Sequence, residues 1–209
     1  MLSVAWKELG KRYNLKWVFR NFSGEIPAGS HVVVKGSNGS GKSTFGKLIV
    51  GATDANGGEI VWAKDGEQVA IDEVPRIIAW SAPFMEVPEN MTVSEILEFH
   101  CTFRASWEEG YLTNLLDKAG ISSHSDEQIK ALSSGQKQRL RLILAMGTKS
   151  DLVVLDEPCS NLDADGIKWY GEELEKLVKR ATVIVCSNNR PEEHLSSAIE
   201  LHLPSPSVA

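Results

Sequence analysis

Two kinds of hydrophobic pattern alternate along this chain. Short runs of consecutive apolar residues are typical of buried strands and occur at 31–34, 77–80, 152–155 and 182–186. Apolar residues with helical spacing predict helices over about 45–50, 111–119, 140–144 and 167–180. Because strands and helices alternate, the pattern predicts an α/β fold, in which the strand at 182–186 is expected to be the last buried strand.

The N-terminal segment follows the alternation of a strand. Leu2, Val4 and Trp6 are separated by polar or small residues, which predicts an edge strand. Glycine and asparagine between 10 and 14 predict a turn. Further strands are expected over 16–22 and, after a strong turn signal at 54–58, over 59–62.

Between 82 and 131 the pattern predicts a small helical lobe inserted into the α/β core. Thr92 and Ser106 are each followed three residues later by a glutamate, the spacing of a capping box at a helix start. Gly120 is placed to end the second helix, and 121–130 is expected to be a loop with one short helix. We predict a single domain, residues 1–209, with its core at about 1–81 and 132–203, the lobe at about 82–131 and a loose tail at 204–209.

Composition narrows the class of protein. Hydrophobic residues make up 42% and charged residues 24% of the chain, as in globular proteins. The net charge of -6 argues against sequence-independent binding of nucleic acid, which needs a basic face, so no nucleic-acid partner is expected. No apolar run approaches the ~20 residues of a membrane helix, so any membrane role is expected to come through a partner chain.

A glycine-rich stretch between a predicted strand and a predicted helix carries the strongest chemical signal. Such a turn directs backbone N–H groups at an anion, and the following helix adds the positive end of its dipole. In the motif G-x-x-x-x-G-K-[ST], Lys42 reaches the β- and γ-phosphates and the Ser43 hydroxyl ligates Mg²⁺. We call this stretch the phosphate loop; its residues are Gly36, Ser37, Asn38, Gly39, Ser40, Gly41, Lys42, Ser43 and Thr44.

Two acidic residues follow the apolar run at 152–155. A phosphate-loop site needs a carboxylate at the end of a buried strand, and Asp156 is expected to hold the Mg²⁺ shell. Glu157 is placed to polarise a water molecule against the γ-phosphorus. Many strands end in acidic residues, so this signal becomes specific only behind the phosphate loop.

This order of motifs resembles that of the ATP-binding cassette (ABC) ATPases over nearly the whole chain. The run LDEP at 155–158 resembles the family's Walker B motif, Asp163 lies in a segment that looks like its D-loop, and Tyr13 sits where the family places an adenine-stacking aromatic. LSSGQ is similar to the LSGGQ signature and contributes Ser133, Ser134, Gly135 and Gln136. The resemblance implies a P-loop NTPase (RecA-like) core with an antiparallel β-subdomain and an inserted helical lobe.

The resemblance also implies a function, an Mg²⁺-dependent ATPase that serves as the ATP-binding subunit of an ABC transporter. Two cassettes, as a homodimer or heterodimer, would sandwich two ATP molecules, and Ser133 and Gly135 of one chain would complete the other chain's site. Closure of the dimer would drive an integral membrane transporter subunit, which implies a cytoplasmic location on the inner face of the membrane. A compact single cassette resembles the haem-exporter ATPase, but the substrate and the direction of transport stay open.

Two positions depart from the family pattern. Ala82 stands at about the place of a glutamine, and alanine can neither ligate Mg²⁺ nor orient water. Asn188 stands at the place of a histidine and cannot carry a positive charge. We therefore expect ATP binding to be intact and hydrolysis to be slow or to depend on a partner, with Glu157, Lys42 and Asn188 as the catalytic groups.

Two alternative functions stay open. The losses at Ala82 and Asn188 favour a degenerate module that holds ATP structurally in a heterodimer. A soluble ABC protein acting on nucleic acid or ribosomes is the other alternative, although no second cassette or long coiled-coil insertion is visible. Trp80, Phe84 and Met85 could pack within the lobe or line a groove that receives a helix of a membrane subunit.

Overall fold

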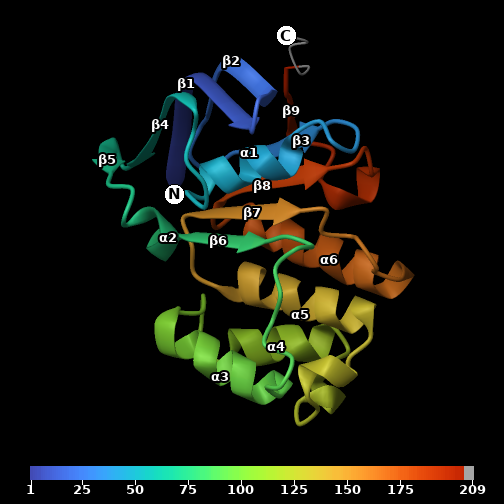
Figure 1. Ribbon diagram of the computed structural model, residues 1–209. Coiled ribbons are helices and arrows are strands. Elements are labelled where there is room, and N and C mark those ends of the chain that lie inside the picture. Colours follow the sequence, from blue (N-terminus) through green and yellow to red (C-terminus); the bar gives the residue numbers. More distant parts are fainter. Residues whose placement is uncertain (205–209) are drawn as a thin grey trace.

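The computed structural model describes residues 1–204 and contains two β-sheets (Figure 1). The remainder of the predicted tail, 205–209, lies outside the described residues. The smaller sheet is antiparallel, in the order β2 (Lys16–Ile26), β1 (Leu2–Tyr13), β4 (Gly57–Lys64) and β5 (Glu67–Val69). The larger sheet is parallel, in the order β6 (Ile78–Ser81), β7 (Leu152–Asp156), β8 (Thr182–Ser187), β3 (His31–Lys35) and β9 (Ile199–His202).

The α-helices are α1 (Lys42–Ile49), α2 (Val74–Ile77), α3 (Val93–Phe103), α4 (Tyr111–Lys118), α5 (Ser134–Gly147) and α6 (Ala164–Leu177). Three short 3₁₀ helices are η1 (Ser122–His124), η2 (Ile129–Ala131) and η3 (Pro191–Glu193). In Figure 1, α5 and α6 lie below the parallel sheet, and α3 and α4 lie below α5. The predicted α/β fold with an antiparallel β-subdomain is confirmed, whereas the division into core and lobe stays a prediction.

The inner strands of the parallel sheet, β7, β8 and β3, are buried on both faces, which explains their runs of consecutive apolar residues. In β7, Leu152 and Val154 belong to the core shared with α1 and the antiparallel sheet, whereas Val153 and Leu155 belong to the core shared with the lower helices. All four side chains are 0% exposed. The strand is therefore rigidly held up to Asp156, the first of the two acidic residues.

The edge-strand prediction for the N-terminus was wrong. β1 lies between β2 and β4, and it continues through the expected turn to Tyr13. Gly10 pairs with Gly57 of β4, next to a shift of register that follows Lys7. The irregularity lets the glycine stay within the strand, because a bulge absorbs a residue that would otherwise break the pairing.

The capping box predicted at Thr92 is confirmed, and the one predicted at Ser106 is wrong. The Thr92 hydroxyl accepts a hydrogen bond from the Glu95 amide at 3.1 Å. The Ser106 hydroxyl instead donates to the carbonyl oxygen of Glu108 at 2.7 Å. α4 begins only at Tyr111, without a side-chain cap.

Three further details add to the prediction or differ from it. β8 is the last buried strand, and a largely exposed strand, β9, pairs with β3 beyond it. α6 covers 164–177 rather than 167–180. The segment 121–130, predicted to hold one short helix, contains η1 and most of a second short helix, η2.

Candidate functional site

The phosphate loop connects β3 to α1, as the sequence predicts. Gly41 precedes the helix with φ 98°, a conformation that favours glycine. A Cβ at Gly41 would lie 2.5 Å from Cγ1 of Val18, so β2 leaves no room for a side chain. The close packing fixes the loop against the antiparallel sheet with its amides at the start of α1.

The Lys42 ammonium group lies within the phosphate loop. The residue is 5% exposed, and Nζ donates to the carbonyl oxygens of Gly36 at 2.7 Å and Ser37 at 3.0 Å. A buried cation beside a helix N-terminus is a strong anion site. The geometry therefore suits the phosphate groups of a nucleotide.

Asp156 ends β7 and is 2% exposed. Burial raises the pKa of its carboxyl group, while a hydrogen bond from the Ser43 hydroxyl opposes that rise. Its Oδ1 atom is buried and has no hydrogen-bond partner within residues 1–204. Carboxylate and hydroxyl oxygens are ligands that Mg²⁺ prefers, so Asp156 and Ser43 together fit this ion.

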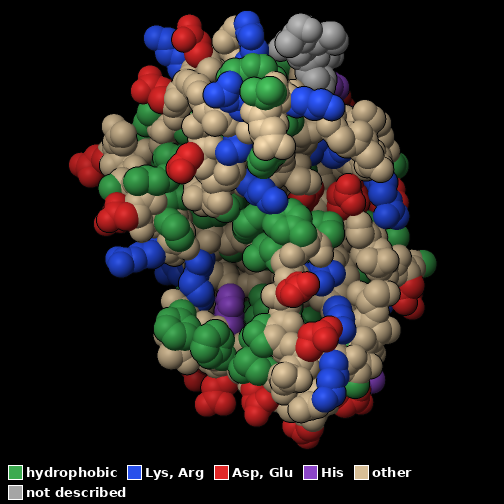
Figure 2. Space-filling model, in the orientation of Figure 1, with side chains coloured by type: hydrophobic (Ala, Val, Ile, Leu, Met, Phe, Trp, Pro, Cys, Tyr) green, Lys and Arg blue, Asp and Glu red, His purple; other side chains and the backbone are tan. Residues whose placement is uncertain are grey.

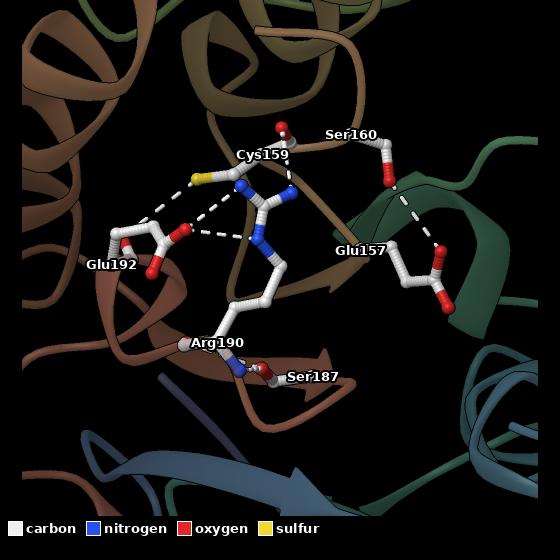
Figure 3. A network of polar contacts seen from close by, with 6 residues as sticks. All are labelled: Glu157, Cys159, Ser160, Ser187, Arg190 and Glu192. Atoms are coloured by element: carbon white, nitrogen blue, oxygen red, sulfur yellow. Dashed lines mark hydrogen bonds and ion pairs between the residues drawn. The ribbon is translucent and has the colours of Figure 1, made fainter. Parts of the chain in front are cut away.

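Glu157 follows Asp156 with φ 45°, which is unusual for a residue with a side chain. Its amide donates to the carbonyl oxygen of Cys186 in β8 at 2.9 Å. Its Oε2 atom accepts a long hydrogen bond of 3.4 Å from the Ser160 hydroxyl (Figure 3). In Figure 3 the Glu157 carboxylate points away from Arg190 and Glu192.

The register of the sheet brings the two departing positions to this edge. Ser81 pairs with Leu155, so Ala82 follows at the level of Asp156. Asp156 pairs with Cys186, so Asn188 lies just beyond the carboxyl end of β8. Ala82 is fully buried and Asn188 is half-buried.

The signature residues form a second cluster. Ser133 caps α5, and its hydroxyl accepts from the Gln136 amide at 3.2 Å in a capping box. A Cβ at Gly135 would lie 2.8 Å from the carbonyl oxygen of Asn161, which explains the glycine. The hollow at this cluster is lined by Gly120, Ile121, Ser133, Ser134, Gly135, Gln136, Arg139, Asn161 and Asp163.

No phosphate-loop residue lines the signature hollow. The structure thus brings the loop, Asp156 and Glu157 together but keeps the signature separate from them. Asp163 accepts from the Gly166 amide at 2.8 Å and forms an ion pair with Arg139, so it caps α6. Whether the signature contacts a nucleotide bound by a second chain stays a prediction.

Tyr13 lies at the end of β1 and is 48% exposed. The Lys11 ammonium lies 5.3 Å from the centre of its ring. The neighbouring strand β2 carries Val18, which packs at Gly41 of the phosphate loop. An exposed aromatic ring near the loop can stack on a base, so the adenine contact stays a prediction.

The apolar residues after β6 line a cavity of about 540 Å³. Trp80 and Met85 contribute to its wall together with Ile96 of α3 and Leu144 of α5. Phe84 is 46% exposed and stacks edge-on against Trp80, with ring centres 5.2 Å apart. Figure 2 shows a hollow bordered by hydrophobic side chains on one face of the molecule.

Ser187 and Arg190 shape the turn after β8, and neither stands out in the sequence. The amide of Arg190 donates to the Ser187 hydroxyl at 3.2 Å, and this bond closes the turn around Asn188. A serine three residues before the bonded amide is a local signal that could have indicated the turn. The ion pair of Arg190 with Glu192 could not be separated from ordinary surface charge by sequence alone.

The family model of the ABC transporter matches residues 19–160 of the chain. This chain therefore belongs to the ABC transporter ATP-binding family. The match includes the phosphate loop, the signature, Asp156 and Glu157. Within residues 1–204, none of the helices combines the length and apolar character needed to cross a bilayer.

Individual relatives agree with the family. The chain is 31% identical to the uncharacterized ABC transporter ATP-binding protein YcbN of Bacillus subtilis, over 86% of this chain and 59% of that protein. It is 28% identical to the cytochrome c biogenesis ATP-binding export protein CcmA of Salmonella typhi, over 83% of each chain. The fold resembles a putative ABC transporter ATP-binding protein from Pyrococcus furiosus, with a TM-score of 0.78, 24% identity and coverage of 96% of this chain and 97% of that chain.

Proposed function

We propose that this chain binds ATP with Mg²⁺ and hydrolyses it slowly, as the subunit that powers transport through a separate membrane protein. The observation that carries the proposal is the meeting of Lys42, Asp156 and Glu157 at one edge of the parallel sheet. Lys42 and the loop amides bind the phosphates, and Glu157 orients the attacking water. Ser43 and Asp156 would hold Mg²⁺, which neutralises charge on the phosphates.

A second copy of the chain, or a related cassette, completes the site. Ser133 caps a helix whose free N–H groups attract an anion, and it lies outside the chain's own phosphate site. Two chains arranged head to tail bring each signature to the other's nucleotide. ATP-dependent dimerisation, measured by light scattering on the Glu157→Gln variant, tests this arrangement; a strictly monomeric variant at saturating ATP contradicts it.

The groove beside Trp80 and Met85 supports a membrane protein as the partner. Its wall is mainly apolar, which suits the apolar face of a helix. Such a partner would hold the chain at the inner face of the membrane, in the cytoplasm. Purification from membranes tests the role: co-purification of an integral membrane protein that Met85→Glu abolishes supports it, and an unchanged complex contradicts the groove as its site.

Slow hydrolysis follows from the two replaced groups. Ala82 offers no polar atom beside Asp156, and Asn188 has no charge to place on the γ-phosphate. A purified chain that turns over ATP at an ordinary ~1–100 s⁻¹ would contradict slow hydrolysis. Tight ATP binding with no turnover, even with the membrane partner present, would favour the second candidate, a structural ATP-binding module in a heterodimer.

A further inference from the structure

Arg190 occupies an unusual position between two loops of the proposed site. It belongs to the turn after β8, which the Ser187 hydroxyl closes by accepting from the Arg190 amide at 3.2 Å and donating to the Arg190 carbonyl oxygen at 3.3 Å. Asn188 lies within this closed turn. The position of the Asn188 backbone is therefore tied to that of Arg190.

The Arg190 side chain reaches across to the segment that follows Glu157 (Figure 3). One guanidinium nitrogen donates to the carbonyl oxygen of Cys159 at 3.3 Å. The Cys159 thiol in turn contacts the carbonyl oxygen of Glu192 at 3.7 Å, so the two segments are linked in both directions. The segment from Glu157 to Cys159 is thus bonded to the turn that carries Asn188.

Glu192 fixes the orientation of the guanidinium group. Its Oε1 atom accepts from Nε of Arg190 at 2.9 Å and lies 2.8 Å from a second guanidinium nitrogen. A planar guanidinium held in this way presents its remaining nitrogen in a defined direction, toward Cys159. A lysine has one nitrogen and no fixed plane, so it cannot hold both partners in this geometry.

We propose that Arg190 is a positioning residue that holds Asn188 and Glu157 in register for ATP hydrolysis, without contacting the nucleotide itself. This inference rests on the proposed ATPase function. The strained backbone of Glu157, with φ 45°, supports it, because such a conformation persists only where its surroundings fix it. A small displacement of a group that orients a water molecule lowers turnover far more than nucleotide affinity.

The test compares Arg190→Ala and Arg190→Lys with the wild-type chain. Steady-state ATP hydrolysis gives kcat and KM, and hydrogen exchange reports on the amides of Ser160 and Leu162, which bond to Glu157 and Cys159 carbonyls. Arg180→Ala is the matched control. Arg180 also pairs with a glutamate, Glu108, but it lies outside the proposed site.

Arg190→Ala is expected to lower kcat about tenfold or more, with KM changed less than about twofold, and to speed exchange at Ser160 and Leu162. The kcat of Arg190→Lys should fall between the values of Arg190→Ala and the wild type. The kcat of Arg180→Ala should match that of the wild type. An unchanged kcat in Arg190→Ala overturns the inference. If the wild type has no turnover even with the membrane partner present, the proposed ATPase function fails. Hydrogen exchange then tests the inference alone, and unchanged exchange at Ser160 and Leu162 in Arg190→Ala overturns it.

Discussion

Ser81 pairs with Leu155 across the parallel strands β6 and β7, and each is followed by a residue of the candidate site. The pairing sets Ala82 level with Asp156. Ala82 is 0% exposed and has no polar side-chain atom, so the position beside the buried carboxylate is apolar. In the proposed function, hydrolysis therefore depends on Glu157 and on the groups at the end of β8.

We predict that Asn188→His raises ATP turnover about tenfold, because an imidazole can carry the positive charge and proton that an amide cannot. The measurement is kcat of the purified chain near neutral pH. Asn189→His is the matched control, since this neighbour is exposed and its φ of 58° is one that histidine tolerates. Equal rates in Asn188→His and wild type would show that the missing charge does not limit turnover.

The pH dependence of stability should change in Glu193→Gln. Glu193 is 0% exposed, and burial raises its pKa above the ordinary 4.5, although Ser187 and Arg190 oppose the rise. A raised folded-state pKa stabilises the fold at low pH, and this contribution is lost as the pH rises from 4.5 through the higher value. Each unit of pKa difference corresponds to about 1.4 kcal/mol.

Urea unfolding of wild type and Glu193→Gln at about pH 5 and pH 8 measures this effect. The variant should gain free energy of unfolding relative to wild type as the pH rises. Parallel pH profiles of the two proteins would contradict a raised pKa of Glu193 in the folded chain.

Ser133→Ala and Thr92→Ala form a matched pair, because both residues cap helices through complete capping boxes. Each substitution should lower the free energy of unfolding by about 1 kcal/mol, the usual cost of a lost cap. Only Ser133→Ala should also weaken ATP-dependent dimerisation, measured by light scattering in a Glu157→Gln background. Equal dimerisation in the two variants would remove Ser133 from the proposed second-chain contact.

Parts of the site could be predicted from the sequence wherever their chemistry depends on residues that are neighbours along the chain. The phosphate loop and the acidic pair after β7 both follow from local spacing. β1 was misplaced at an edge because its pairing with β4 joins segments far apart in the chain, and alternation shows only one strand. Ser106 has the spacing of a cap but bonds to Glu108, and spacing alone cannot reveal that competition.

The contacts of Arg190 could not be predicted from the sequence, for a related reason. Arg190 and Cys159 are far apart along the chain and meet only because β7 and β8 are neighbours in the sheet. Likewise, the groove beside Trp80 depends on the separation of α3 from β6, which no local pattern encodes. Packing between distant segments therefore determined the features that the sequence left open.

The central claim is that the phosphate loop binds ATP and that Glu157 drives its hydrolysis. The most direct measurement is ATP hydrolysis by the purified wild-type chain beside Glu157→Gln, with ATP affinity measured separately for both. The account predicts slow turnover in wild type, a loss of about 100-fold or more in the variant, and equal ATP affinity in the two proteins. Absence of ATP binding by the wild type, or undiminished hydrolysis by Glu157→Gln, would contradict it.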